Sequence, residues 1–336
     1  MLIESESIET NPLVSVIILV YNHKKYIKKC LDSILSQKVD FPYEIIVGDD
    51  YSTDGSREIC LSYKNRYPEI IRLLFHEKNG GLIFNYSQLK KSCRGKYIAQ
   101  IAGDDYWCND EKLQIQVSFL ESHLNVGLCY TNTISCDDEG IENTAPMIDS
   151  NYMPKSFEEQ LFKTCYMAPN TWMMRSSVDK SISEQQAWFT DESLAVALDY
   201  LHESKMAFLD CVTSVYRVHE GSLAAQKDIR KKWEYSKGLF KMQMYYAQKY
   251  NVGSDVLRRL LFQEYASKML MAIEANDEAF VKNALEYYSS QGMEMKWFAL
   301  SCREYVNDKQ KYKQISKSHA YRLGKLILKP LRLFKK

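Results

Sequence analysis

Apolar runs of strand length alternate with amphipathic segments of helix length through the N-terminal part of the chain. Residues 13–20 (LVSVIILV) are almost continuously apolar, which is typical of a parallel strand buried on both faces. Residues 24–37 follow with apolar side chains at helical spacing, and residues 43–48 (YEIIVG) form a second apolar run. A chain that repeats strand and helix in this order is expected to form a doubly wound α/β fold with a mostly parallel sheet.

The same pattern predicts how the chain divides. Beyond residue 221 the apolar spacing is helical, so we predict a domain boundary near residue 222. The predicted parts are an N-terminal tail (1–12), an α/β domain (13–222), a helical accessory region (223–308) and a basic amphipathic tail (309–336). The expected strands are 13–20, 43–48, 71–75, 96–102, 127–132, 166–175 and 210–217, and the expected helices are 24–37, 54–66, 82–91 and 111–123.

Composition excludes several classes of protein. The nine cysteines are an odd number without CxxC spacing, which disfavours a disulfide framework or a zinc ribbon. The N-terminus is acidic where an export signal would be basic and then apolar, and no apolar stretch reaches the roughly 18 residues of a membrane span. We therefore expect a folded cytoplasmic protein.

Two pairs of aspartates stand where predicted strands end. Asp49 and Asp50 follow YEIIVG, and Asp104 and Asp105 follow YIAQIAG. Parallel strands end at the same edge of a sheet, so the four carboxylates are expected to converge there. Neighbouring carboxylates repel unless a cation or hydrogen-bond donors compensate, and Mg²⁺ or Mn²⁺ would suit them together with a substrate's phosphates. The alternative is that each pair only caps a helix or shapes a turn.

Other sites for metals and nucleotides are disfavoured by the sequence. Residues 50–55 (DYSTDG) copy the start of an EF-hand loop, but its twelfth position is Leu61, where the calcium loop needs Glu. The chain after the first strand (YNHKKY) has neither a G-x-G-x-x-G fingerprint nor a Walker lysine loop.

Several motifs together resemble glycosyltransferase family 2. They are VSVIILVYNHKKYIKKCLDSILSQ, YEIIVGDDYSTDGS, NGGLIFN, GKYIA and GDDYW, in the family's order, and the resemblance runs from about residue 12 to 222. It implies the GT-A fold and the transfer of a sugar from a nucleoside diphosphate donor to a hydroxyl, with inversion at the anomeric carbon. It also implies a divalent metal, usually Mg²⁺ or Mn²⁺.

The resemblance also implies residues that bind the donor. Asp50 matches the acid that contacts the nucleotide base, with Asp49 beside it, and Tyr51 stands where glycine is common in the family. Asp104 and Asp105 match the DxD-type motif. Arg217 is expected to neutralise phosphate charge. The other donor-binding positions carried over are Val20, Tyr21, Asn22, Asn79, Gly80, Gly81 and Asn85.

The metal ligands implied by the resemblance are Asp105, Asp104 and His219. Asp105 is expected to contact the metal directly, and Asp104 to contact the ribose or support the site. Ala102 departs from the family, because many members carry an acid two residues before the Asp pair. His219 has an alternative as an ordinary surface histidine.

The segment WFTDESLAVALDYL matches the part of the family that supplies the general base. Direct inverting displacement needs a carboxylate that accepts the acceptor's proton, and Asp191 is the candidate, with Glu192 as the neighbouring alternative. Thr190 followed by two acids is also a typical helix start, so a purely capping role stays open.

The tail differs in charge from the rest of the chain. The whole protein carries a net charge of +1, but after Asp308 the sequence holds ten basic and no acidic residues. Leu and Ile interleave with these cations, which is typical of a helix lying in a membrane interface. Packing on its own domain is the alternative, and no nucleic-acid motif is present.

These observations predict a glycosyltransferase that uses a UDP- or GDP-type sugar and extends a lipid-linked surface glycan at the inner face of the cytoplasmic membrane. The first alternative is a catalytically inactive relative that binds nucleotide sugars or acts as a scaffold in polysaccharide assembly. The second is a nucleotidyltransferase, but the glycine- and lysine-rich nucleotide loop of that class is missing after the first strand of this sequence.

Overall fold

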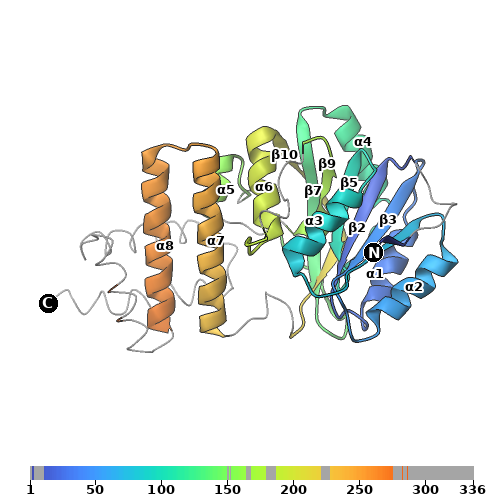
Figure 1. Ribbon diagram of the computed structural model, residues 1–336. Helices are drawn as coiled ribbons and strands as arrows, with labels where there is room; N and C mark the ends of the chain where they lie inside the picture. The colour runs from blue at the N-terminus through green and yellow to red at the C-terminus, as the bar shows by residue number, and fades with distance from the viewer. Residues whose placement is uncertain are drawn as a thin grey trace. The chain divides into compact units, whose positions relative to one another are not determined.

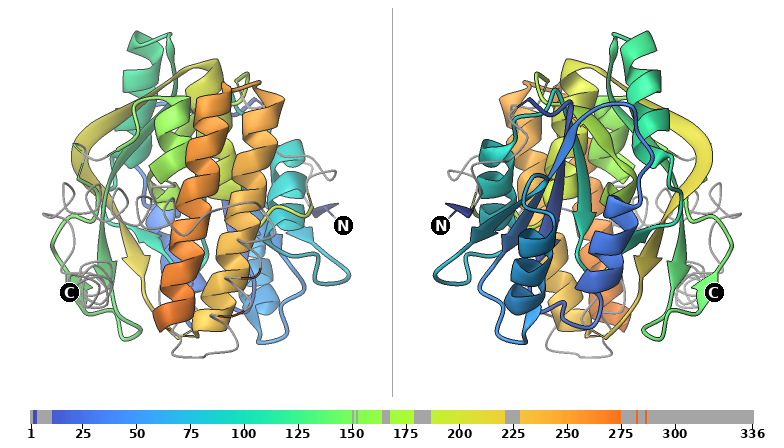
Figure 2. Two further views of the ribbon diagram at one scale, coloured as in Figure 1. Left: turned by 90° about the vertical axis from the view of Figure 1, so that its left-hand side faces the viewer. Right: turned by 90° about the vertical axis from the view of Figure 1, so that its right-hand side faces the viewer.

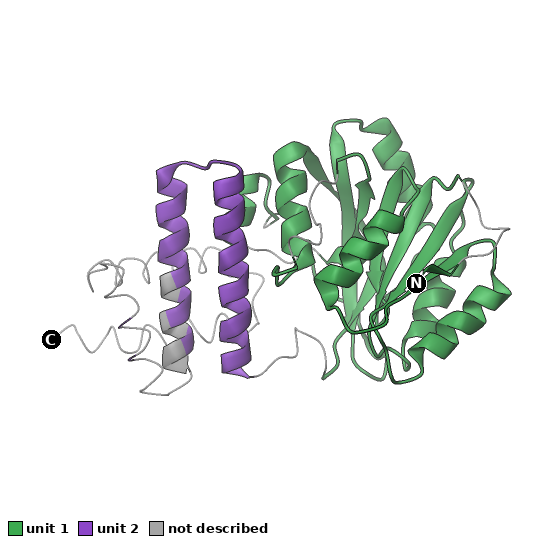
Figure 3. Cartoon of the chain, viewed as in Figure 1, with its two compact units in different colours: residues 1–225 green, residues 226–336 purple. Residues whose placement is uncertain are grey.

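The computed structural model describes residues 2–3, 11–149, 151, 153–163, 168–178, 187–220, 228–274, 282 and 286. The chain divides into two compact units, Met1–Ala225 and Gln226–Lys336 (Figure 3). All described strands belong to the first unit, and the described part of the second unit is helical.

The first unit is built on a ten-stranded sheet. β2 (Val14–Val20) pairs in parallel with β3 (Tyr43–Asp49) on one side and with β5 (Tyr97–Ala102) on the other. β4 (Ile71–Phe75) continues the parallel set beside β3. These four strands agree with the predicted ones to within one residue at each end, and the predicted α/β fold with a mostly parallel sheet is confirmed.

Antiparallel strands complete the sheet. β9 (Met173–Arg175) lies between β5 and β7 (Val126–Cys136) and runs antiparallel to both. β10 (Lys205–Arg217) returns parallel to β7, and β6 (Tyr106–Trp107) pairs antiparallel with β10. The sheet ends at β6 on this side and at the short strand β1 (Leu2–Ile3), which pairs with β4, on the other; the short strand β8 (Glu142–Asn143) pairs with β7.

One predicted strand is wrong in part. Within the predicted range 166–175, the residues Pro169–Thr171 form the 3-10 helix η2, and β9 takes up only the last three residues. Proline fixes φ and lacks an N–H, so it begins a helical turn more readily than it joins a sheet.

Helices cover both faces of the sheet (Figure 1 and Figure 2). α1 (Ile27–Leu35), α2 (Ser56–Arg66) and α4 (Lys112–Ser122) share one hydrophobic core with one face, and α3 (Leu82–Ser92) and α6 (Glu192–Glu203) pack on the other. α5 (Phe157–Lys163) packs on α6.

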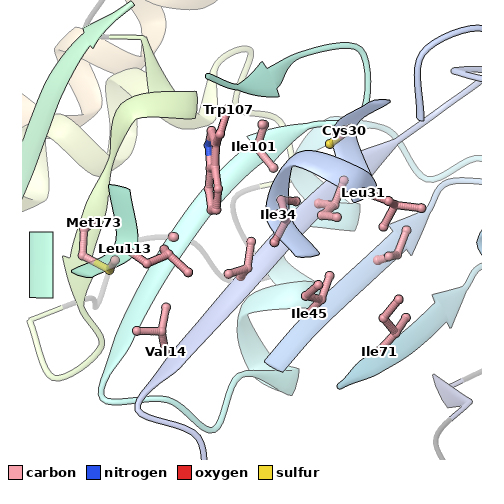
Figure 4. Close-up of a cluster of buried hydrophobic side chains, with 14 of the residues drawn as sticks. Val14, Cys30, Leu31, Ile34, Ile45, Ile71, Ile101, Trp107, Leu113 and Met173 are labelled. Atoms are coloured by element: carbon pink, nitrogen blue, oxygen red, sulfur yellow. The ribbon is translucent and has the colours of Figure 1, made fainter. Parts of the chain in front are cut away.

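The larger core lies between the strands and α1 (Figure 4). Leu31 and Ile34, one turn apart on α1, are fully buried there with Ile45 of β3. On the other face, a Cβ at Gly48 would meet Leu89 Cδ1 at 2.7 Å, so the absence of a side chain lets α3 approach β3 closely. This close contact sets the position of α3 against β3.

The second unit contains two long helices, α7 (Ile229–Lys249) and α8 (Ser254–Glu274), which pack on each other. The predicted basic tail 309–336 lies outside the described residues. Within the described part of the chain, none of the helices is both long and apolar enough to cross a membrane.

Candidate functional site

The carboxyl ends of β2, β3 and β5 meet at one edge of the sheet. Val20 pairs with Asp49, and Leu19 pairs with Ala102, so the three strands end at the same level. Main-chain hydrogen bonds continue just past the strands, from Asp50 N to Val20 O (2.9 Å) and from Gly103 N to Leu19 O (2.9 Å). Both pairs of aspartates therefore stand at neighbouring strand ends on this edge.

The carboxylate of Asp50 holds the loop that precedes α3. Its oxygens accept hydrogen bonds from Gly80 N (2.8 Å) and Gly81 N (2.7 Å), and Asn79 Oδ1 also accepts from Gly81 N (3.1 Å). Gly81 has a φ of +84°, which glycine adopts without strain. Each carboxylate oxygen has a second lone pair, so Asp50 can still accept a further hydrogen bond from a ligand.

Asp49 is fully buried and faces α2. Its Oδ1 accepts from Ser52 N (3.0 Å) and from Arg57 Nε, while its Oδ2 is buried without a hydrogen-bond partner among the described residues. Asp49 therefore shapes the turn after β3.

The loop after β2 is tied to the loop after β3. Asn22 N donates to Ser52 Oγ (2.9 Å), and Asn22 Oδ1 accepts from Thr53 N (2.9 Å). Tyr21 is 48% exposed beside this connection. The side-chain oxygen of Asn22 is thus hydrogen-bonded within the protein, whereas the side chain of Tyr21 is exposed to solvent.

Asn85 is buried between α3 and β3. Its Nδ2 donates to Gly48 O (2.8 Å), and its Oδ1 lies 3.0 Å from His76 Nε2. These contacts position α3 on the sheet and do not direct the amide toward the loops that carry the aspartates.

Asp104 lies between two histidines. His219 Nε2 is 3.0 Å from Asp104 Oδ2, and His23 Nε2 is 4.0 Å from Asp104 Oδ1. Burial alone would raise the pKa of Asp104, but the hydrogen bond with His219 and the charge of His23 hold the pKa below its usual value. Oδ1 is buried and has no hydrogen-bond partner among the described residues.

Asp105 is held by the protein through both oxygens. Oδ1 accepts from Arg217 N (2.8 Å), and Oδ2 accepts from Asn170 Nδ2 (2.9 Å). Burial, followed by the adjacent charge of Asp104, raises the pKa of Asp105 well above its usual value. Asp105 therefore joins β10 and η2 to the loop after β5.

The guanidinium of Arg217 is buried and contacts main-chain oxygens. Nε donates to Asp104 O (3.0 Å), and Nη1 donates to Asp137 O (2.9 Å). The rings of Tyr26 and Tyr106 lie 4.8 and 5.7 Å from the guanidinium carbon. Arg217 is thus placed to hold the Asp104 loop, and a role at a phosphate would require it to move.

The two acids at the start of α6 differ in environment. Asp191 is the N-cap, and its Oδ1 accepts from Leu194 N (2.8 Å). Glu192 is buried, and its Oε1 accepts from Gln100 Nε2 (3.0 Å). Burial and the charge of Asp191 raise the pKa of Glu192 to about 7. The bond to Gln100 fixes the start of α6 to β5, the strand that leads to Asp104.

A divalent metal would fit at Asp104. Its unpartnered buried oxygen and the imidazole of His219 are oxygen and nitrogen donors of the right kind. Among the described residues, no set of three His, Cys, Asp or Glu side chains is arranged to hold a metal ion. A metal would therefore depend on oxygen atoms of a substrate or of water for its other ligands.

His23 and Gln100 were not among the candidates from the sequence. His23 follows the predicted Asn22 directly, but its contact with Asp104 depends on the packing of Gly103, where a Cβ would meet His23 Nδ1 at 2.9 Å. For Gln100, the one feature of the sequence that could have indicated a role is that it is a polar residue within the apolar run of β5.

Comparison with known proteins identifies relatives of the first unit. The family described as "Glycosyl transferase family 2" matches residues 15–182. "Uncharacterized protein Rv1520" of Mycobacterium tuberculosis is 30% identical over 228 residues, which cover 66% of this chain and 63% of the relative, less than two thirds of its length.

Two further proteins are named for their ligands. "UDP-Glc:alpha-D-GlcNAc-diphosphoundecaprenol beta-1,3-glucosyltransferase WfaP" of Escherichia coli is 32% identical over 219 residues, covering 64% of this chain and 81% of the relative. The crystal structure of S. aureus TarS 1-349 in complex with UDP-GlcNAc has a TM-score of 0.57 at 19% identity, covering 81% of this chain and 79% of that one. The likeness to TarS concerns the fold.

Proposed function

The chain belongs to glycosyltransferase family 2 and has the GT-A fold, and from this premise we propose that it transfers a sugar from a nucleoside diphosphate to a hydroxyl of a growing glycan. The observation that carries the proposal is the meeting of Asp50, Asp104 and their loops at one edge of the sheet. In open α/β sheets, ligands bind beyond the carboxyl ends of the strands.

The proposed donor is a UDP- or GDP-type sugar. The base and ribose would lie at the ends of β2 and β3, near Tyr21 and Asp50, and the diphosphate near Asp104. The acceptor we propose is a glycan carried on a lipid, because the name of WfaP specifies a diphosphoundecaprenol acceptor.

Asp104 and His219 would hold a divalent metal, Mg²⁺ or Mn²⁺. When bound, the metal supplies positive charge that stabilises the leaving diphosphate. Asp105 is assigned a positioning role, because its oxygens join Arg217 N and Asn170 Nδ2 to this loop, whereas Asp104 keeps one buried oxygen without a hydrogen-bond partner among the described residues. We therefore assign to Asp104 the direct metal contact that the family resemblance implies for Asp105.

Asp191 is the proposed general base. The acceptor oxygen forms a bond to the anomeric carbon while the bond from that carbon to the diphosphate breaks, which inverts the configuration. The hydroxyl proton passes to an Asp191 carboxylate oxygen, and the nucleoside diphosphate leaves with the electron pair. Glu192 is buried on Gln100 and supports the position of Asp191.

A second candidate function is that of an inactive relative that binds nucleotide sugars. It is favoured by Ala102, which stands where many members carry an acid, and by the capping bond of Asp191 to Leu194 N.

Donor binding and turnover distinguish these functions. Full-length protein would be tested by calorimetry and by transfer or donor hydrolysis with a panel of nucleotide sugars and Mn²⁺. We expect Asp104→Asn to lose donor binding and Asp191→Asn to bind donor without turnover. Glu121→Gln is the matched control, because Glu121 pairs with Lys96 before the start of β5, at the opposite edge of the sheet. Donor binding without turnover in the native protein favours the inactive relative.

We also propose that the tail 309–336 attaches the protein to the inner face of the cytoplasmic membrane. The charge pattern of its sequence supports this. Flotation with anionic liposomes would compare the full chain with a variant ending at Asp308. Equal flotation of the two proteins would contradict the proposal.

A further inference from the structure

Tyr51 has a backbone conformation that is unusual for its side chain. It follows Asp50 at the end of β3 and has a φ of +68°, in the left-handed region that a bulky residue rarely adopts. The residue is 45% exposed, so burial of its ring does not account for the conformation. Strained residues of this kind cluster at active sites and ligand-binding sites, where the strain is part of the mechanism.

The ring of Tyr51 is held from one side. The guanidinium carbon of Arg57 lies 5.4 Å from its centroid. Arg57 is itself fixed, because Nε donates to Asp49 Oδ1, Nη2 donates to His76 O, and the ring of Phe75 lies 4.9 Å from the guanidinium. A cation over an aromatic face is an attractive contact that orients the ring.

Tyr51 belongs to the same turn as predicted nucleotide contacts. The turn that carries Tyr51 is closed by the bond from Ser52 N to Asp49 Oδ1 (3.0 Å) and joined to the β2 loop by the bond from Asn22 N to Ser52 Oγ (2.9 Å). The neighbouring strand end contributes the exposed Tyr21. Two solvent-facing aromatic residues therefore come from adjacent strand ends, next to Asp50.

We propose that Tyr51 is a specificity-determining residue whose ring stacks on the base of the donor nucleotide. This inference rests on the proposed function, since it needs a nucleotide at this edge. A planar base stacks favourably on an aromatic ring, and a ring already fixed by Arg57 loses little freedom on binding. The side chain of Tyr51 is exposed at this turn, where a glycine would offer no surface.

The opposing explanation is that Tyr51 is only a turn residue. In that case the ring serves to cover Arg57, and removing it would change stability without changing nucleotide binding. Asparagine and glycine both tolerate a positive φ, so replacing Tyr51 with either residue removes the ring and relieves the strain together.

The test measures nucleotide affinity and stability in the same variants. Calorimetry on the full-length protein with Mn²⁺ would first identify the preferred ligand among UDP, GDP, CDP and ADP. We expect Tyr51→Phe to bind it within about twofold of the native protein, and Tyr51→Asn and Tyr51→Gly to bind about tenfold or more weakly. The melting temperatures of the latter two should equal or exceed that of the native protein.

Pyrophosphate with Mn²⁺ is the probe that lacks a base. Its affinity should be the same in all four proteins, because only the base contacts the ring. Native-like affinity for the preferred nucleotide in Tyr51→Gly would overturn the inference, as would an equal loss for pyrophosphate. If the native protein binds none of the four nucleotides, the proposed function fails, and this inference fails with it.

Discussion

His219 Nε2 lies 3.0 Å from Asp104 Oδ2, which joins the segment after β10 to the loop after β5. The hydrogen bond with Asp104 raises the pKa of His219 above its usual value. The other oxygen of Asp104 is buried without a hydrogen-bond partner among the described residues, with His23 Nε2 at 4.0 Å. Asp104 thus has one oxygen that is hydrogen-bonded to His219 and one that could bind a cation. This suits a residue that binds a cation only when the donor is present.

Replacing Asp104 with Asn should lower kcat/KM by about 100-fold or more, because a neutral amide cannot balance the charge of a metal beside a diphosphate. His219→Ala should raise the Mn²⁺ concentration needed for half-maximal rate. Initial rates measured across a series of MnCl₂ concentrations check both variants against Glu121→Gln. Native metal dependence in Asp104→Asn would rule out the assignment.

The two acids at the start of α6 should differ in their effect on turnover. Asp191→Asn should reduce the transfer rate by about 100-fold or more, since no carboxylate then accepts the acceptor's proton. Glu192→Gln keeps the hydrogen bond to Gln100 and should reduce the rate by less than about tenfold. Single-turnover rates with saturating donor make the comparison. The reverse order of effects would make Glu192 the base.

Glu192 should also make the stability of the protein depend on pH. Its pKa is about 7 in the folded state and 4.5 in a model peptide, so between these values the folded protein holds a proton that the unfolded chain has lost. Stability from this group is full below pH 4.5, falls by about 3 kcal/mol as pH rises from 4.5 to 7, and changes little above pH 7. Urea denaturation at pH 5 and pH 8 would show this loss in the native protein and its absence in Glu192→Gln. Identical losses in the two proteins would mean that Glu192 is not the cause.

The parallel half of the sheet could be predicted because its strands are buried on both faces. Residues 71–75 were predicted and found as β4, since a strand of this kind leaves a mostly apolar run, which only Arg72 interrupts here. β9 was predicted only as the end of a longer strand, 166–175. Its three residues, Met173–Arg175, are too few to show a period, and their antiparallel place between β5 and β7 depends on long-range packing.

In the candidate site, too, the positions of residues at strand ends could be predicted, whereas their long-range contacts could not. Placement of Asp50 and Asp104 at one edge follows from strand direction alone. The partners of these acids do not, because the contacts of Asp104 with His219 and of Asp105 with Asn170 join segments 115 and 65 residues apart. The two hydrogen bonds of the Asp105 carboxylate could be known only from the positions of β10 and η2.

Glu44, at the start of β3, provides a test of the fold that is separate from the site. It is fully buried and accepts hydrogen bonds from Ser15 Oγ (2.6 Å), Arg72 Nη1 (3.0 Å) and Arg94 Nη2 (2.7 Å). Glu44→Ala leaves the buried Arg72 without its carboxylate, which should lower the free energy of unfolding by about 3–5 kcal/mol. Urea denaturation measures this change.

The affinity for nucleotide should remain native-like in Glu44→Ala below its melting temperature, because Glu44 and Asp49 stand at opposite ends of β3. Calorimetry with the preferred nucleotide and Mn²⁺ checks this expectation. A loss of affinity comparable to that of Asp104→Asn would show that the two edges of the sheet are coupled, and that the nucleotide contacts depend on more than the loops after β2, β3 and β5.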